Sequence, residues 1–73
     1  MKHHFKIQNR LHVCRAEKRI TQADLAKKLG IARTTIVKIE KGNYNPSLEL
    51  AFKLAEFFNT SVDNIFSYKR IEK

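Results

Sequence analysis

Residues 21–42, TQADLAKKLGIARTTIVKIEKG, carry the strongest structural signal in the sequence. Thr21 is a good N-cap residue, because its hydroxyl can accept a hydrogen bond from the first turn of a helix. Gly30 and Gly42 suit helix ends, because glycine adopts the left-handed backbone region without penalty. The pattern therefore predicts two short helices in succession, the second over about 33–41.

The connection between these two helices determines how they pack. Gly30-Ile31-Ala32 is too short for an antiparallel return, so the helices must cross steeply and leave the outer face of the second one projecting. That face is uncharged or positive throughout and comprises Arg33, Thr34, Thr35, Val37, Lys38 and Lys41. A projecting helix about 10–12 Å across fits a DNA major groove about 12 Å wide. The segment therefore favours binding to duplex DNA.

The flanking sequence predicts three further helices and no strand. A first helix is expected from about His4 to Lys18, with Ile7, Leu11 and Cys14 on one face. A fourth is expected to begin at Ser47 and to end at Asn59. Its inward side chains are Leu48, Ala51, Leu54, Ala55 and Phe58. A short fifth follows Ser61 and holds Val62, Ile65 and Phe66. We expect an all-α, compact five-helix fold in one domain, residues 1–73, with a core over about 5–67 and a fraying tail over 68–73.

Two residues are expected to lower the stability of the fold. Arg19 stands at a turn where a left-handed conformation would cost about 1 kcal/mol. Ala32 precedes the helix over about 33–41 and has no side chain with which to cap it, at a cost of about 1 kcal/mol.

Composition narrows the function classes. Lys and Arg number 15 against 7 Asp and Glu, and residues 1–46 carry the whole excess of +8. The positive electrostatic field of these residues attracts a polyanion. A single cysteine excludes an internal disulfide, no stretch of about 18 apolar residues occurs, and no signal peptide is expected from the basic first ten residues. We therefore expect a cytoplasmic protein.

Catalysis and metal binding are not expected. No nucleophile with its base can be assembled from the sequence, so the chain is not predicted to be an enzyme. The three histidines, His3, His4 and His12, lack a fourth ligand, and Cys14 is interpreted as a small core residue. No cofactor or metal is predicted.

Residues 7–66 resemble the phage-repressor family of helix-turn-helix regulators, which includes the lambda repressor, Cro and the xenobiotic-response-element regulators. The resemblance lies in the phrases TQADLAKKLG, KIEKG and NPSLELAFKLA, and in Gln22, Ala26, Gly30, Ile36 and Ile39 at the family's spacings. It implies a lambda-repressor-like domain of five helices, in which helices 2 and 3 form the helix-turn-helix and the third reads bases.

The resemblance also implies roles for individual residues. Base contacts fall to Arg33, Thr34 and Lys38, and phosphate contacts to Gln22, Thr35, Lys41, Asn43 and Tyr44. Arg15 and Glu40 match a structural ion pair between the first and third helices. The departures from the family pattern, at Arg19, Ala32, Lys41 and Cys14, bear on stability and affinity more than on function.

Several apolar residues exceed what one small core needs: Leu50, Phe57, Phe66, Tyr68 and Ile71. Packing at the edge of the domain is the simple interpretation. The alternative is a twofold dimer interface, common in the family in this region, which would place two recognition helices about 34 Å apart on DNA.

The sequence thus predicts a bacterial or phage-derived transcriptional regulator, most simply a homodimeric repressor that occupies a near-palindromic operator. One alternative keeps the fold but makes the chain an antitoxin, which contacts a toxin and represses its own promoter, or a controller of a restriction-modification operon. Another is non-specific nucleic-acid binding by charge alone, with a steep salt dependence.

Overall fold

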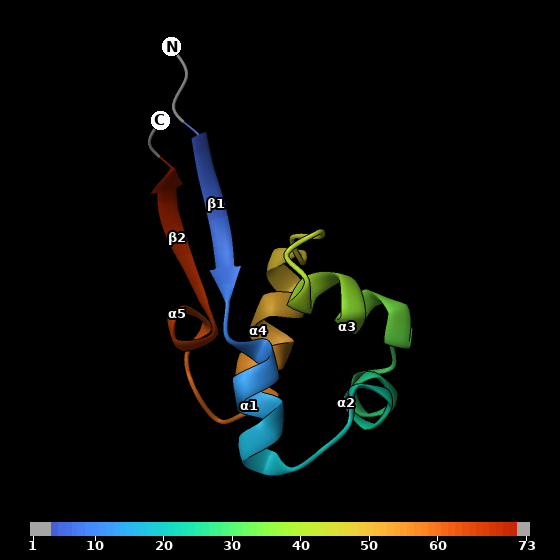
Figure 1. Cartoon of the computed structure of the whole chain (residues 1–73). Helices are drawn as coiled ribbons and strands as arrows, with labels where there is room; N and C mark the ends of the chain where they lie inside the picture. Colours follow the sequence, from blue (N-terminus) through green and yellow to red (C-terminus); the bar gives the residue numbers. More distant parts are fainter. Residues whose placement is uncertain (1–3, 72–73) are drawn as a thin grey trace.

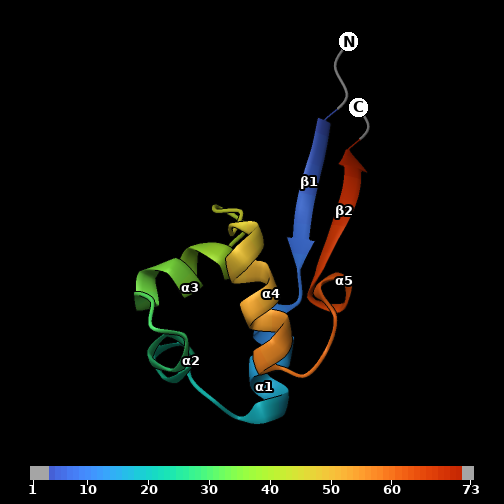
Figure 2. The same cartoon turned by 180° about the vertical axis from the view of Figure 1, so that it is seen from behind.

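The computed structural model describes residues 4–71, without the side chains of His4, Phe5 and Ile71. In chain order the elements are β1 (His4–Asn9), α1 (Leu11–Lys18), α2 (Gln22–Leu29), α3 (Arg33–Glu40), α4 (Leu48–Phe57), α5 (Val62–Ile65) and β2 (Phe66–Ile71). Helices α2 and α3 lie on one side of α4, and the two strands lie on the other (Figure 1 and Figure 2). The five expected helices are present, but the expectation of a chain without strands is wrong.

The strands β1 and β2 form an antiparallel two-stranded ribbon. Their register runs from His4 opposite Ile71 to Asn9 opposite Phe66. Figure 1 shows this ribbon projecting from the helical body, with the His4–Ile71 pair at its far end. The part expected to fray after residue 67 is therefore a strand as far as Ile71, and Phe66 begins that strand instead of ending the last helix.

Helix α1 begins at Leu11 and not near His4, because Asn9 turns the chain from strand to helix. The Asn9 side-chain oxygen accepts a hydrogen bond from the Leu11 N–H at 3.1 Å, and its amide donates to the Ile39 carbonyl at 2.9 Å. Ile7, expected on this helix, lies in β1. The helix ends at Lys18, and the Arg19 that follows has a φ of 58°, the left-handed conformation for which the sequence analysis gave a cost.

The sequence signals for α2 and α3 are confirmed. The Thr21 hydroxyl accepts a hydrogen bond from the Asp24 N–H at 3.0 Å, and Gly30 ends the helix with a φ of 72°. Ala32 precedes α3 without a side-chain cap, and Gly42 follows it with a φ of 79°. Helix α3 crosses α2 (Figure 1), as the short three-residue connection predicted.

Helix α4 also begins as predicted, because the Ser47 hydroxyl accepts a hydrogen bond from the Leu50 N–H at 3.1 Å. Asn59, with a φ of 55°, turns the chain after the helix. One expectation here is wrong: Leu48 does not point inward but is 73% exposed.

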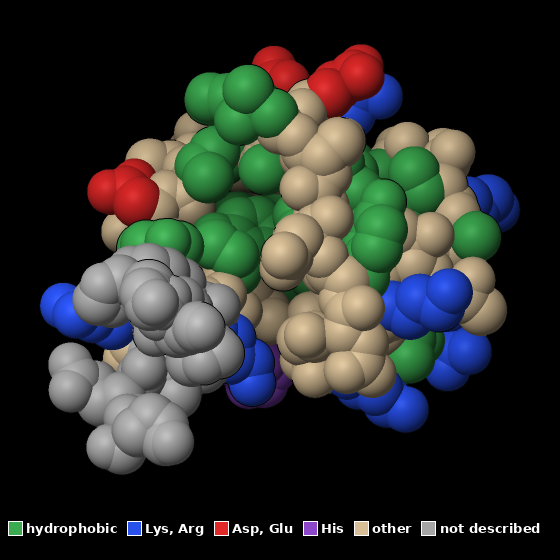
Figure 3. Space-filling view, turned by 90° about the horizontal axis from the view of Figure 1, so that it is seen from above, with side chains coloured by type: hydrophobic (Ala, Val, Ile, Leu, Met, Phe, Trp, Pro, Cys, Tyr) green, Lys and Arg blue, Asp and Glu red, His purple; other side chains and the backbone are tan. Residues whose placement is uncertain are grey.

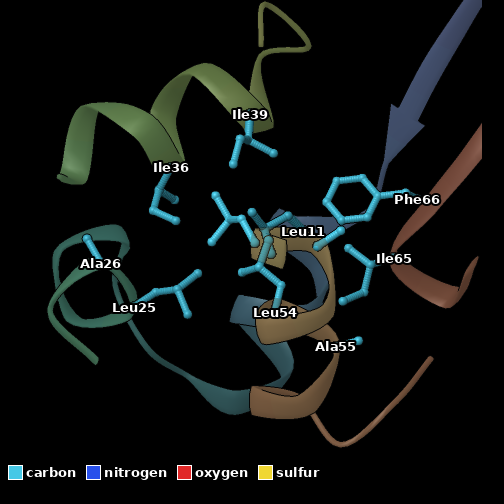
Figure 4. Close-up of a cluster of buried hydrophobic side chains, with 11 residues drawn as sticks. Leu11, Leu25, Ala26, Ile36, Ile39, Leu54, Ala55, Ile65 and Phe66 are labelled. Carbon is cyan, nitrogen blue, oxygen red and sulfur yellow. The ribbon is translucent and has the colours of Figure 1, made fainter. Parts of the chain in front are cut away.

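The core lies where the five helices meet the base of the ribbon. Six side chains are fully buried: Leu11, Leu25, Ile36, Ile39, Leu54 and Ile65. Each contributes roughly 1.5–3 kcal/mol through burial. Figure 4 shows Ile36 and Ile39 reaching inward from α3 toward Leu54 on α4. This packing fixes which face of α3 is left outside.

Candidate nucleic-acid interface

Helix α3 presents to solvent the face that the sequence assigns to base contacts. Arg33, Thr34 and Lys38 are all exposed, while Ile36 and Ile39 on the opposite face anchor the helix in the core. In Figure 1 and Figure 2 neither the ribbon nor α4 covers the outer side of α3. A rod held in this way can enter a groove without rearrangement of the domain.

The expected phosphate-side residues surround this face. Lys41, Asn43 and Tyr44 are exposed in the turn that follows α3, and Tyr44 keeps 44% of its surface accessible. Thr35 is half-buried within α3, and Gln22 is the half-buried first residue of α2. Gln22 thus lies at the start of α2, whereas Lys41, Asn43 and Tyr44 follow the C-terminal end of α3.

A chain of side-chain hydrogen bonds links α1, α2 and α3. Arg15 donates from Nε and Nη2 to the two carboxylate oxygens of Glu40, at 2.7 and 3.1 Å. Glu40 Oε1 also accepts from Gln22 Nε2 at 3.0 Å, and Gln22 Oε1 accepts from Arg33 Nη2 at 3.2 Å. The structural ion pair implied by the resemblance is thus present, and it continues through Gln22 to the first residue of α3. Sequence reasoning missed this continuation, although Gln22 and Arg33 each begin a helix of the same crossing pair.

The electrostatics of this network favour its charged form. Burial acts to raise the pKa of Glu40, but the hydrogen bonds from Arg15 and Gln22 and the positive charge of Arg15 outweigh burial and lower the pKa. The hydrogen bond to Glu40 raises the pKa of Arg15. The side chains of Arg15 and Glu40 are 20% and 9% exposed. The one carboxylate of α3 is therefore neutralised within the protein and does not repel a polyanion at the outer face.

A cleft at the start of α2 includes Arg19, a residue to which the sequence analysis gave no contact with DNA. Arg19 and Arg33 line it together with Gln22 and the cap residue Thr21. The first N–H groups of a helix have no partners within the helix and carry partial positive charge. An anion entering this cleft would meet both the arginines and the helix end. The left-handed backbone of Arg19 was the available signal, since it turns the chain directly into the cleft.

The residues expected at a dimer interface differ in their exposure to solvent. Leu50 and Phe66 are each only 9% exposed and belong to the core of the single chain, which corrects their assignment to an interface. Phe57 is half-buried, with its ring 5.0 Å from that of Phe58. Tyr68 is 66% exposed, and the side chain of Ile71 lies outside the described part of the structure.

Other chemistry finds no support in the described residues. Residues 4–71 contain no group of three or more His, Cys, Asp or Glu side chains that could hold a metal ion. Cys14 is half-buried against the core, where burial and the nearby Glu17 raise its pKa and keep it a neutral thiol. None of the helices described is both long and apolar enough for a membrane span.

Comparison with known proteins agrees with this geometry. A family described as helix-turn-helix matches residues 11–65. The uncharacterised HTH-type transcriptional regulator MJ0272 of Methanocaldococcus jannaschii is 54% identical over 63 residues, which cover 86% of this chain and 96% of the relative. The transcriptional repressor RstR of the cryptic phage CTXphi in Vibrio cholerae is 32% identical over 53 residues, 73% of this chain and 48% of RstR.

Structural similarity leads to the same group. The crystal structure of a candidate DNA-binding protein from Bacteroides fragilis superimposes with a TM-score of 0.76 at 31% identity, covering 84% of this chain and 98% of the other. The family model spans α1 to α5 and therefore includes the exposed face of α3 and the network behind it. The chain belongs to the helix-turn-helix family of DNA-binding transcriptional regulators, of the phage-repressor type, and this family consists of DNA-binding proteins and not of enzymes.

Proposed function

We propose that this protein is a sequence-specific regulator that binds a near-palindromic operator as a dimer and represses transcription by occupying a promoter. The observation that carries the proposal is the exposed outer face of α3, whose first residue is held from behind by Gln22. A DNA-reading side chain that is already oriented loses less conformational entropy on binding than a free one.

Arg33 is the residue that we assign to a guanine. A guanidinium has five N–H donors, and among the residues that the structure describes Arg33 uses one of them, in the bond from Nη2 to Gln22. The remaining donors suffice for a bidentate contact with O6 and N7 of guanine in the major groove. Thr34 can place its methyl group against a thymine, and Lys38 can reach a guanine or a phosphate.

Gln22 serves two purposes in this proposal. Its amide has two N–H groups, and one of them is donated to Glu40. The second N–H, together with the N–H groups of the first turn of α2, can bind a backbone phosphate. Arg19 lines the same cleft and adds a positive charge to that contact.

The remaining phosphate-side residues are Thr35, Lys41, Asn43 and Tyr44. Their contacts fix the orientation of the domain on DNA but carry no sequence information. In a dimer, two copies of this arrangement would face successive major grooves about 34 Å apart, which requires a symmetric operator. Such a regulator would act in the cytoplasm, where the DNA is.

Selection of bound sequences from random duplex DNA tests the proposal. The expected result is a motif of two inverted half-sites whose centres lie about 10 base pairs, or a multiple of this, apart. A reporter placed behind that motif should then be expressed less when the protein is present. Binding without enrichment of any sequence, together with a steep salt dependence, would show that charge alone drives the interaction.

A further inference from the structure

One face of the ribbon is basic. Lys6 on β1 lies directly opposite Lys69 on β2. Residues that pair across a sheet point to the same side of it, and alternate residues along each strand point to that side as well. Gln8 and Ser67 form the next pair on this side, and all four residues are exposed. These four residues, called the basic face below, present two ammonium groups and two polar side chains to solvent.

The basic face is suited to an anion. Like charges directly opposite each other in an antiparallel pair destabilise that pair. Within the part of the chain that the structure describes, neither Lys6 nor Lys69 takes part in an ion pair. The strands themselves, HFKIQN and FSYKRI, contain no Asp or Glu. An anion bound between the two lysines would replace their mutual repulsion by two attractions.

The basic face begins beside the turn that follows α3. A Cβ atom added to Gly42 in this turn would lie 3.9 Å from Cε of Lys6. At the base of the same strand, a hydrogen bond of 2.9 Å to the Ile39 carbonyl ties β1 to the last turn of α3. Gly42 stands between Lys41 and Asn43, two of the residues assigned above to phosphates. The basic face is therefore adjacent to the proposed DNA-binding surface.

The shape and charge of this end of the molecule agree with such an extension. The ribbon and the turn after α3 lie at the same end of the helical body (Figure 1 and Figure 2). Figure 3 views the molecule from that end, and most basic side chains gather along the lower and right margins of the view, whereas the acidic ones lie at its upper and left margins. A strand of six residues spans about 20 Å, and the phosphates of one DNA strand follow each other about every 3.4 Å along the helix axis. The ribbon is therefore long enough to pass several phosphates.

We propose that the basic face binds the sugar-phosphate backbone of the same duplex that α3 reads. Lys6 and Lys69 bind phosphates next to those bound by Lys41, at the opposite end of α3 from Gln22. The proposal rests on the proposed function, in which α3 enters the major groove, and it adds a second group of backbone contacts. Because phosphates carry no sequence information, the ribbon should raise affinity without changing base preference.

The salt dependence of binding by the full chain tests the proposal. Two probes are used, the duplex selected from random DNA and the unselected random pool. Each phosphate contact contributes about 0.9 to the slope of log K against log salt. Lys6→Gln and Lys69→Gln should each reduce the steepness of this slope by about 0.9 and weaken binding about 3- to 8-fold at about 0.1 M salt, and the double variant should show both losses.

Lys53→Gln supplies the matched control. It removes one positive charge, as the ribbon variants do, but from an exposed site on α4 beside Glu49. The net charge of the protein changes equally in all three single variants, so a general loss of electrostatic attraction would affect them equally. The control should leave affinity within about twofold of the wild type.

Lys69→Glu separates a lost contact from damage to the fold. It places a carboxylate directly opposite Lys6, and opposite charges in this arrangement stabilise an antiparallel pair. The urea midpoint of unfolding should therefore be equal to that of the wild type or higher, whereas DNA affinity should fall further than with Lys69→Gln. Weaker binding by a variant that is at least as stable cannot come from unfolding.

Ethylation interference on the selected duplex locates the contacts. Ethylation of a phosphate that Lys69 binds should weaken the wild-type complex but not the complex of Lys69→Gln. The phosphates identified in this way should lie next to those identified with Lys41→Ala. Phosphates elsewhere on the duplex would contradict the placement of the ribbon.

The proposal is overturned if the double variant keeps the salt slope and the interference pattern of the wild type, or if Lys53→Gln loses as much affinity as the ribbon variants. Either result would mean that the basic face does not contact DNA. Failure to select any motif with the wild type would count against the proposed function instead. The salt slopes on the random pool would still decide whether the ribbon binds the backbone.

Discussion

Neutralising Glu40 should destabilise the fold more than any other loss of a single negative charge among the described residues. Its carboxylate accepts three hydrogen bonds, two from Arg15 and one from Gln22, at 2.7 to 3.1 Å. Glu40→Gln keeps the size of the side chain but removes its charge, and the new amide group faces two donors. The substitution therefore isolates the contribution of the charge.

The magnitude follows from the burial of the pair. A hydrogen bond to a charged group contributes about 1.5–3 kcal/mol, and breaking a fully buried ion pair costs about 3–5 kcal/mol. Here the Arg15 side chain is 20% exposed and keeps a hydrogen bond to the Ile20 carbonyl at 3.0 Å, so its charge is partly compensated after the loss of Glu40. We expect a loss of about 2–3 kcal/mol, which lowers the melting temperature of a domain of this size by roughly 10–20 °C.

Urea unfolding followed by circular dichroism between pH 7 and pH 3 measures this effect. The native pKa of Glu40 is lowered, so its stabilisation is present above the unfolded value of about 4.3 and is lost as the pH falls through the native pKa. The stability gap between wild type and Glu40→Gln should therefore be largest at neutral pH and shrink in acid. Glu56→Gln, at an exposed site on α4, should change stability by less than about 0.5 kcal/mol. A Glu40→Gln loss no larger than this, or a gap that does not vary with pH, would refute the reasoning.

Two further changes test the local structure, each by urea unfolding at pH 7. Arg19→Gly should raise the free energy of unfolding by about 1 kcal/mol, because it removes the strain of a left-handed arginine with a φ of 58°; a loss of stability would show that no strain is present there. Thr21→Ala should lower it by about 1 kcal/mol through loss of the hydrogen bond to the Asp24 N–H, and Thr21→Ser should restore it. If alanine and serine are equally stable at this position, the cap contributes nothing.

The helix-turn-helix could be predicted because its signals are local. Thr21 caps α2, and Gly30 and Gly42 take left-handed conformations. Ile36 and Ile39 are buried and three residues apart, which is the spacing of one face of a helix. These features need no knowledge of distant contacts, and the same is true of the exposed face of α3 that follows from them.

The ribbon could not be predicted by the same reasoning. Ile7, Leu11 and Cys14 have helical spacing, yet Ile7 pairs with Tyr68 at the far end of the chain. Strand formation there depends on that distant partner more than on the intrinsic preference of residues 4–9. Asn9 offered the one local signal, since asparagine side chains favour turns by accepting a hydrogen bond from the N–H two residues on, and Asn9 accepts this bond from Leu11.

The sequence indicated which side chains are exposed on α3, but not the hydrogen bonds that link the residues behind them. The spacing of the residues indicates which side chains project from α3, because periodicity determines the exposed face. It does not show that Gln22 joins Glu40 to Arg33, because this bridge depends on how steeply α2 and α3 cross and on the rotamers of three side chains. Leu50 and Phe66 were placed at a dimer interface for a related reason. In a helix-only fold they exceed what the core needs, whereas in the structure both are buried in the core.

The most direct test of the central claim, that the outer face of α3 reads bases, is to repeat the DNA selection with Arg33→Ala and Lys41→Ala. Arg33→Ala should lose its preference at one base pair in each half-site, with a cost of about 1–3 kcal/mol for the favoured base and little change elsewhere. Lys41→Ala should weaken binding to all sequences about equally. If Arg33→Ala instead weakens every sequence alike and leaves the selected motif intact, α3 does not read DNA in the manner described.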